Sequence, residues 1–474
     1  MSRRNKELPL LERVEIMDAG AEGMAVARVD GLVVFVPFVV PGDVVDIQLY
    51  RKKKNYAEGR AIRFHKQSPL RVEPACPHFG VCGGCKWQTT KYSAQLEAKQ
   101  RQVRDNLERL GGIDCSGMRP ICGSESIYYY RNKLEFTFST RAWRTTPDDI
   151  QPEQGALGFH IPQLFDKVLN IEHCALQAEP SNAIRLAVRD YAYSNNLPFY
   201  DIRNHTGFLR NLVIRNTSTG QWMVIVVVAE EDNESLFPLL DMLHQRFPQI
   251  TSLQHIINNK MNDSYSDLEV HTYFGNDHIE EEMTPYRPEE QANLRFIINP
   301  KSFYQTNSAQ AQRLYSFVAE LAELQPKDIL YDLYTGTGTI ALFLASQVRK
   351  VVGIEYVEEA IADARLNAKR NGFNNTVFYA GDMAKVLTQE FIAANGRPDV
   401  VVTDPPRAGM HESVVRQLLQ TAPRKIVYVS CNPATQARDL QLLSERYRIG
   451  RIQPVDMFPH TQHVENIVEL ILAQ

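Results

Sequence analysis

The chain has 474 residues, of which 44% are hydrophobic and 23% charged, and its formal net charge is −4 at pH 7. A chain of this size has room for roughly two to four globular domains, and its charge argues against a protein that coats nucleic acid non-specifically. No apolar leader is visible, and the most apolar stretch, residues 31–45, is interrupted by prolines and too short to cross a bilayer. We therefore expect a cytoplasmic protein without membrane contact, whose seven cysteines are reduced.

The N-terminal segment contains several short runs of β-branched residues. These runs lie between residues 14 and 64 and are separated by Gly, Pro and Asp. Such spacing predicts a small OB-like β-barrel over residues 1–68. Two basic runs, residues 3–6 and 51–54, are compatible with binding of single-stranded nucleic acid and equally with a solvated charge run.

A loop with three cysteines opens the next segment, residues 69–299, which is predicted to form a β-rich central domain. Cys76, Cys82 and Cys85 lie close together in sequence, and clustered thiols in a reducing compartment suggest metal ligation or catalysis. Thiolates bind both Zn²⁺ and [4Fe–4S] clusters, so local spacing leaves the metal open. A fourth ligand has to come from elsewhere in the chain.

The remainder of the central segment is predicted to contain three helices among its strands. A polar helix is expected over residues 93–110, packed on the catalytic domain, and two further helices lie near residues 183–193 and 236–247. Between residues 131 and 141, cations alternate with aromatic side chains. That alternation fits an RNA-binding platform and a half-buried antiparallel strand equally well.

Helices alternate with apolar strands from residue 300 to residue 474. Strands are predicted at 329–333, 351–354, 377–379, 400–403 and 425–429, and helices at 307–324, 340–346 and 357–371. This alternation is typical of a doubly wound parallel sheet, which is a Rossmann-like α/β fold. We therefore expect the third domain to bind a nucleotide cofactor.

The first of these strands runs into a Gly-rich turn that begins at Asp332 and ends at Gly338. Glycines let the backbone approach a ligand, and the helix that follows offers free N–H groups. Glu355 ends the second strand, where a carboxylate can accept both ribose hydroxyls. Asp382 follows the third strand and is placed to face an adenine amino group.

Two nucleotide cofactors compete for this turn. The spacing of Gly336, Gly338 and Ala341 also fits a dinucleotide fingerprint, so NAD is one candidate. S-adenosylmethionine is favoured because an acid opens the turn, which does not suit a pyrophosphate. It is favoured also because the fourth strand ends in Asp404-Pro405-Pro406, a sequence typical of methyltransferases.

Cys431 follows the last predicted strand, in the sequence Ser430-Cys431-Asn432-Pro433. A thiol at a strand end beside a cofactor site is a candidate covalent nucleophile. A lone cysteine is more often a buried structural residue, so this motif needs support from others. Cys115 and Cys122 have no partner pattern and are interpreted as ordinary residues.

Together these motifs resemble the RNA 5-methyluridine methyltransferase family, above all its bacterial 23S ribosomal RNA (uracil-5-)-methyltransferases with a TRAM barrel and an iron–sulfur cluster. The resemblance covers nearly the whole chain. It rests on residues 23–27, 54–58, 76–80, 82–85, 303–307, 332–338, 404–407, 430–433 and 463–465. The chain differs at Thr335, where many relatives carry Cys, and at Thr339, where some carry Asn.

The resemblance implies the roles of individual residues. S-adenosylmethionine would be contacted by Gln305, Tyr334, Thr339, Glu355, Asp382 and Asp404. Cys431 would be the nucleophile that adds to uracil, and Glu465 the base that removes the C5 proton. Cys174 would join Cys76, Cys82 and Cys85 as the fourth ligand of a [4Fe–4S] cluster, with zinc as the alternative.

The resemblance also implies the partner. RNA would be the substrate, with 23S ribosomal RNA expected and transfer RNA as the alternative, and the enzyme is expected to be a monomer. The target base has to leave its stack, so an unpaired or remodelled RNA loop is expected. Two rivals remain, a cytosine C5 methyltransferase and a non-catalytic RNA-binding factor for ribosome assembly.

Overall fold

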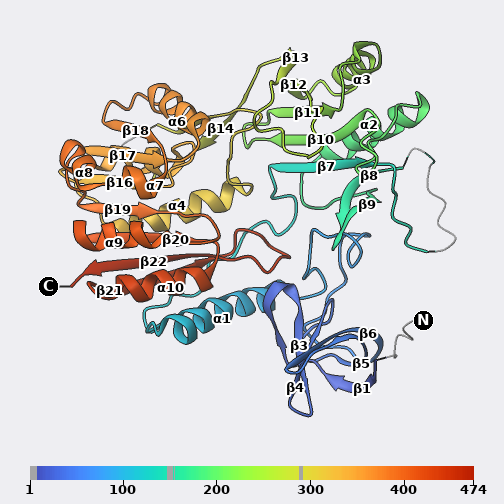
Figure 1. The fold of residues 1–474 in the computed structure, drawn as a ribbon, viewed down its shortest axis with the longest axis horizontal. Coiled ribbons are helices and arrows are strands. Elements are labelled where there is room, and N and C mark those ends of the chain that lie inside the picture. Colours follow the sequence, from blue (N-terminus) through green and yellow to red (C-terminus); the bar gives the residue numbers. More distant parts are fainter. Residues whose placement is uncertain (1–7, 147–152, 154, 288–291, 474) are drawn as a thin grey trace.

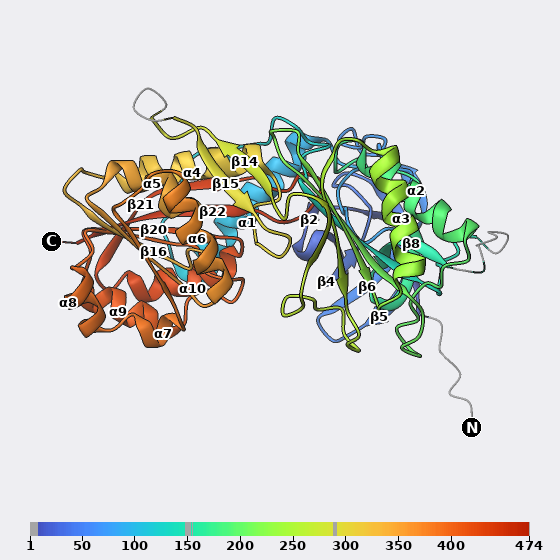
Figure 2. The same ribbon diagram turned by 90° about the horizontal axis from the view of Figure 1, so that it is seen from above.

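The computed structural model describes residues 8–146, 153, 155–287 and 292–473. Its secondary structure forms four sheets (Figure 1). Seen from above, the C-terminal sheet and its helices make up one lobe, while the central sheet and the N-terminal barrel make up the other (Figure 2). The basic run at residues 3–6 lies outside the described residues. No helix in the described ranges is long and apolar enough to cross a membrane.

The N-terminal barrel is a six-stranded sheet in the order β1-β5-β6-β4-β3-β2. Its elements are β1 (Leu10–Glu15), β2 (Asp18–Ala19), the 3₁₀ turn Ala21–Gly23, β3 (Ala25–Val29), β4 (Leu32–Val36), β5 (Val44–Lys52) and β6 (Tyr56–Lys66). Alternate apolar residues such as Val34, Val36, Val45 and Ile47 fill its core. The basic residues 51–54 are exposed.

The central sheet has seven strands in the order β13-β12-β11-β10-β7-β8-β9. Its strands are β7 (Lys133–Ser139), β8 (Ala156–Ile161), β9 (Leu164–Asn170), β10 (Leu209–Asn216), β11 (Trp222–Val228), β12 (Ile250–Ile257) and β13 (His271–Gly275). Helices α2 (Ser181–Ser194) and α3 (Asn233–Arg246) contribute to the same core. Phe136 and Phe138 of β7 are fully buried there, so the aromatic side chains of this strand are core and do not form an RNA platform. The short hairpin β14 (Ile279–Met283) and β15 (Leu294–Ile298) follows.

The C-terminal sheet has seven strands in the order β18-β17-β16-β19-β20-β22-β21. They are β16 (Ile329–Leu333), β17 (Lys350–Glu355), β18 (Thr376–Ala380), β19 (Val400–Thr403), β20 (Lys425–Ser430), β21 (Tyr447–Val455) and β22 (Glu465–Leu472). Strands β16 to β20 are parallel, as predicted. The last two strands were not among the predicted ones, and they are antiparallel: β22 inserts between β20 and β21.

The helices of the C-terminal lobe are α4 (Ser308–Ala322), α5 (Thr339–Leu344) with the 3₁₀ turn Ala345–Gln347, α6 (Glu358–Arg370), α7 (Met383–Val386), α8 (Gln389–Asn395), α9 (Glu412–Thr421) and α10 (Pro433–Leu443). Helix α1 (Tyr92–Gly111) precedes the central sheet in sequence but lies along α10 (Figure 1). Val103 and Leu107 of α1 share a core with Ala437 and Leu440. The segment after α1 also bridges β21, so residues from the N-terminal half complete the C-terminal lobe.

Candidate active site

Two carboxylates, the buried Asp332 and the half-buried Asp404, lie where the order of the parallel strands reverses, between β16 and β19. Leu333 at the end of β16 pairs with Thr403 at the end of β19, which brings Asp332 and Asp404 to the same edge. Burial raises the pKa of both carboxyls to about 7, and the charge of Asp332 adds to the rise at Asp404. Ligands of open α/β sheets bind at such a reversal.

Asp332 has one oxygen without a partner. Its Oδ2 accepts a hydrogen bond from Thr335 Oγ1 at 2.5 Å, but Oδ1 is buried and has no hydrogen-bond partner among the residues that the structure describes. A buried acceptor without a donor is costly. The site therefore suits a ligand that carries a positive charge or a donor group.

The Gly-rich turn is held open beside Glu355. One carboxylate oxygen of Glu355 accepts from Gly336 N at 3.1 Å, and the other accepts from the backbone N–H groups of Tyr356 and Val357. Tyr334 has a left-handed φ of 63°, which is strained for a residue with a side chain. A Cβ on Gly336 would meet no atom within 4 Å. A ligand can therefore approach the backbone of this turn closely.

Tyr334 is electrostatically influenced by both Glu355 and Asp382. Burial raises the pKa of the Tyr334 phenol to about 12, and the charges of Asp439, Asp382 and Glu355 add to this rise. Asp382 itself caps α7, because its Oδ1 accepts from Ala384 N at 3.0 Å. The carboxylates predicted to bind ribose and adenine are therefore both near enough to Tyr334 for their charges to affect its pKa.

The loop before α4 carries Gln305 and is braced by the central sheet. Arg215 of β10 is fully buried and donates to three backbone carbonyls between residues 299 and 302 at 3.0–3.1 Å. Asn132 Nδ2 donates to the Gln305 carbonyl at 2.8 Å. Phe303 on this braced loop stays 68% exposed. No local pattern in the sequence marks Arg215 or Asn132 for these bracing roles.

Cys431 and Glu465 meet across the end of an antiparallel ladder. Ser430, the last residue of β20, pairs with Asn466, the second residue of β22. The next position along the ladder places Cys431 beside Glu465, although 33 residues lie between them in sequence. This neighbour relation exists because β22 runs antiparallel to β20.

The thiol and the carboxylate share one electrostatic environment. Burial raises the pKa of Cys431 to about 11, and the charges of Glu465 and Asp404 add to the rise. Burial, followed by the charge of Asp404, also raises the pKa of Glu465 well above its usual range. Arg407 opposes both shifts. The site therefore brings an ionisable thiol close to two carboxyl groups and one guanidinium, and their charges influence one another.

Hydrogen bonds connect the turn after β19 with the residues that follow Cys431. The Arg407 carbonyl accepts from Asn432 Nδ2 at 3.0 Å and from Thr435 Oγ1 at 3.1 Å. These bonds join the turn after β19 to the turn after β20.

His463 lies two residues before Glu465. Burial, and to a lesser extent the charge of Arg407, lowers the pKa of His463 to about 4, so this imidazole is neutral at pH 7.

Tyr315 of α4 is a site residue that sequence reasoning missed. Its hydroxyl lies 3.1 Å from Thr339 Oγ1. Burial raises its pKa, and the charges of Asp404, Asp332 and Glu465 contribute to the shift. In the sequence, Tyr315 is one more apolar position of a helix, so only the fold distinguishes it.

The cysteine loop and Cys174 come together in the other lobe. Burial raises the pKa of Cys82 to about 12, and the charges of Cys174, Cys85 and Cys76 add to the rise. Asn182 holds the backbone of Cys174 through two hydrogen bonds, at 2.8 and 3.2 Å. In the described part of the chain, however, no group of three or more His, Cys, Asp or Glu is arranged to hold a metal ion. The thiols are therefore neighbours without the geometry of a closed metal site.

Comparisons with known proteins place this site in a family. A profile described as tRNA (Uracil-5-)-methyltransferase matches residues 269–472, and a TRAM domain profile matches residues 12–62. The chain is 57% identical over 459 residues to an uncharacterized RNA methyltransferase of Bacteroides thetaiotaomicron, covering 95% of this chain and 99% of that protein. The chain belongs to the RNA (uracil-5-)-methyltransferase family.

Other relatives agree with membership of the RNA (uracil-5-)-methyltransferase family. An uncharacterized RNA methyltransferase of Porphyromonas gingivalis is 53% identical, covering 97% of this chain and 99% of that protein. The crystal structure of Pyrococcus abyssi tRNA (uracil-54, C5)-methyltransferase with S-adenosyl-L-homocysteine has a TM-score of 0.74 and 29% identity, covering 97% of this chain and 100% of that chain. The C-terminal lobe thus has the S-adenosylmethionine-dependent methyltransferase fold, and the N-terminal barrel is a TRAM domain.

Proposed function

We propose that this RNA (uracil-5-)-methyltransferase transfers a methyl group from S-adenosylmethionine to C5 of uracil through a covalent bond between Cys431 and uracil C6. The meeting of Cys431 with Glu465 at the end of the β20–β22 ladder carries this proposal. A non-catalytic RNA-binding factor would not need a thiol and a buried acid side by side. Among the residues that the structure describes, no other cysteine follows a strand of the C-terminal sheet, which disfavours the cytosine alternative.

The chemistry explains why a thiol is needed. Uracil C5 is a poor nucleophile, and S-adenosylmethionine supplies an electrophilic methyl group when bound. Addition of the Cys431 thiolate to C6 forms an S–C bond and moves the electron pair of the C5–C6 double bond into an enolate. The C5 carbon can then accept the methyl group. A thiolate suits this step because it is strongly nucleophilic.

The second half of the reaction needs a base. The methylated adduct still carries the original proton on C5. Glu465 takes this proton, the electrons re-form the C5–C6 double bond, and the C6–S bond breaks to return the thiolate. A carboxylate whose pKa is raised by burial is a stronger base than an exposed one. Arg407 lies near both groups and supports their ionised forms.

The cofactor would bind along the strand ends. Glu355 would hold the ribose hydroxyls, Asp382 would face the adenine, and Tyr334 would lie between them. Gln305, Thr339 and Asp404 would contact the remainder of S-adenosylmethionine. The unpaired Asp332 Oδ1 and the open space at Gly336 support this assignment.

RNA would be bound by the other parts of the chain. We propose three domains over residues 1–68, 69–299 and 300–474, in which the first two position RNA for the third. The exposed basic residues 51–54 and Phe303 fit contacts to phosphates and to a displaced base. The protein would act as a cytoplasmic monomer.

The substrate is proposed to be 23S ribosomal RNA, and transfer RNA is the second candidate because the Pyrococcus abyssi neighbour acts on tRNA. Deletion of the gene is expected to remove one 5-methyluridine from ribosomal RNA completely and to leave transfer RNA unchanged. Nucleoside mass spectrometry of the two purified RNA pools checks this. Loss from transfer RNA alone would establish the second candidate, and no loss from either pool would contradict the proposed reaction.

A metal centre is proposed at Cys76, Cys82, Cys85 and Cys174, with [4Fe–4S] preferred and zinc as the alternative. Cys85 and Cys174 are buried and Cys76 and Cys82 are partly buried. Burial raises the pKa of all four thiols, and neighbouring thiols add to the rise at Cys82 and Cys174, so the group is costly to ionise without a cation, which supports the proposal. Such a centre would join the loop of residues 76–85 to the loop that carries Cys174 and so rigidify this part of the lobe.

Removal of one ligand tests the metal centre. Cys82→Ala protein, purified without oxygen, is expected to lose essentially all bound metal and to melt at a lower temperature, because metal binding stabilises the fold. Cys122→Ala is the control, since this buried thiol lies outside the loop. Elemental analysis with acid-labile sulfide distinguishes iron–sulfur from zinc. Metal-free wild-type protein would contradict the proposal.

A further inference from the structure

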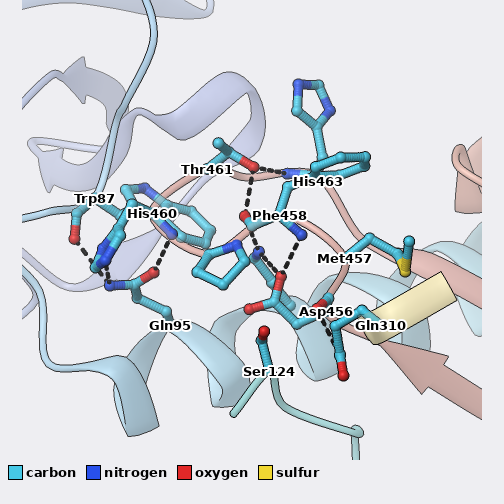
Figure 3. Close-up of polar contacts among 12 residues, drawn as sticks. Trp87, Gln95, Ser124, Gln310, Asp456, Met457, Phe458, His460, Thr461 and His463 are labelled. Atoms are coloured by element: carbon cyan, nitrogen blue, oxygen red, sulfur yellow. Dashed lines mark hydrogen bonds and ion pairs between the residues drawn. The ribbon is translucent and has the colours of Figure 1, made fainter. Parts of the chain in front are cut away.

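The segment between β21 and β22, residues 456–464, leads directly into Glu465. Most of its residues are buried, and it is fastened by groups from outside the C-terminal sheet. Figure 3 shows Gln95 of α1 reaching the segment at His460 and Gln310 of α4 reaching it at Asp456. The residue proposed as base therefore follows a segment whose path other parts of the chain define.

A buried ion pair anchors the start of this segment. Lys99 Nζ of α1 lies 2.5 Å from Asp456 Oδ1, and both side chains are 0% exposed. The same ammonium donates to the Phe458 carbonyl at 3.0 Å. Tyr92, about two turns earlier on α1, donates its hydroxyl to Asp456 Oδ2 at 2.8 Å. Helix α1 thus supplies two partners of this carboxylate, and the Phe458 N–H, which donates to Oδ1 at 3.0 Å, is the third.

The middle of the segment is held by α1 and by the cysteine loop. His460 has a left-handed φ of 65°, which requires support from its surroundings. Its N–H donates to Gln95 Oε1 at 2.9 Å, and its carbonyl accepts from the N–H groups of Lys86 and Trp87 at 2.8 and 3.1 Å. Lys86 follows Cys85 directly, so the cysteine loop and α1 meet at this residue.

The segment is also tied to the loop that carries Gln305. Asn307 Nδ2 donates to the Met457 carbonyl at 3.1 Å. Gln310 Nε2 donates to the Asp456 carbonyl at 2.9 Å. The segment therefore cannot shift without disturbing either α1 or the start of α4.

We propose that the Lys99–Asp456 ion pair is a positioning device that holds segment 456–464 so that Glu465 reaches the C5 proton of the Cys431 adduct. This inference rests on the proposed function, in which Glu465 is the base. Proton abstraction needs the carboxylate within hydrogen-bond reach of the proton. A misplacement of about 1 Å can cost roughly 10²-fold in rate. Formation of the adduct uses Cys431, which directly follows β20, and depends less on this segment.

The inference predicts a defect in one step. Lys99→Met keeps a long side chain but removes the charge. With natural RNA and S-adenosylmethionine, this variant should accumulate the methylated covalent adduct and should lose roughly 10–100-fold in kcat. KM for RNA should be unchanged. Arg109→Met is the matched control, because Arg109 lies on the same helix in an exposed ion pair with Asp105.

The trapping step separates this inference from the proposed function. RNA with 5-fluorouridine should be captured by Lys99→Met in a single turnover at nearly the wild-type rate. If trapping and turnover fall by the same factor, or if turnover is normal, the positioning role is wrong. If wild-type protein itself captures no fluorinated RNA, the proposed function has failed instead.

If Lys99→Met does not fold, two variants that disturb the buried core less can test the positioning role instead. Tyr92→Phe removes one hydrogen bond from Asp456 and leaves the ion pair in place. Lys99→Met with Asp456→Asn removes both charges together, so no unpaired charge stays buried. Both should accumulate adduct relative to Arg109→Met, with Tyr92→Phe showing the smaller effect. Folded variants that release product normally would overturn the positioning role.

Discussion

RNA that contains 5-fluorouridine is expected to become covalently bound to wild-type protein in the presence of S-adenosylmethionine, and Cys431→Ala is expected to abolish this bond. Fluorine cannot leave C5 as a proton does, so the adduct is trapped after methyl transfer. Without the thiol, C5 is not activated, and methylation of natural RNA should fall by roughly 10⁴-fold or more. Peptide mapping of the trapped complex by mass spectrometry locates the modified residue.

The Cys431 prediction has a matched control and a pH signature. Cys115→Ala removes another buried thiol, outside the site, and should trap fluorinated RNA normally. Burial and the charges of Glu465 and Asp404 raise the pKa of Cys431 to about 11, so the thiol is protonated in the free enzyme at pH 7. Because only the thiolate adds to C6, the trapping rate should rise as the pH is raised. Methylation that persists in Cys431→Ala would refute the covalent mechanism.

Glu465→Gln is expected to stop the reaction one step later. The amide cannot take the C5 proton, so the methylated uridine stays bonded to Cys431. Steady-state turnover should fall by roughly 10²–10⁴-fold, the usual contribution of a general base. Denaturing gels with labelled natural RNA should show a stable protein–RNA complex, and digestion should release a methylated nucleotide attached to the peptide.

An exposed acid supplies the control for the Glu465 variant. Glu412 lies at the start of α9 in an exposed pair with Arg416, so Glu412→Gln should turn over at the wild-type rate without a stable complex. Normal turnover in Glu465→Gln would remove this residue as the base. Loss of turnover without any complex would mean that Glu465 acts before the adduct forms.

Local sequence patterns predicted many elements closely. The polar helix expected at 93–110 is α1 (Tyr92–Gly111), and the strands expected at 329–333 and 400–403 are β16 and β19 without change. These elements are defined by periodicity and by turn residues, which are local properties. Strands β21 and β22, and with them the antiparallel part of the sheet, are absent from the prediction; Pro454 lies inside β21, and a proline within a run argues against a strand by local rules.

Some residues of the site could be predicted from local motifs, and others are recognised only in the tertiary structure. Motifs marked Cys431, Asp404 and Glu355, because each follows an apolar strand and begins a polar turn. Tyr315 carried no such mark, since it looks like one more core position of α4. Lys99 also looked like a surface lysine on a polar helix, yet it is fully buried. Its role depends on a partner that is 357 residues away in sequence.

The amino-acid sequence alone determined the chemical groups of this protein: a thiol and several acids at strand ends, a Gly-rich turn, and clustered cysteines. Those features are local, so residue order is enough to reveal them. Only the tertiary structure decided which groups are neighbours. Cys431 lies beside Glu465 because β22 inserts antiparallel next to β20, and Asp456 is paired with Lys99 because α1 packs across the lobe. Both contacts join distant segments, and burial then shifts the pKa values of Cys431, Glu465 and Lys99 in a way that residue order does not encode.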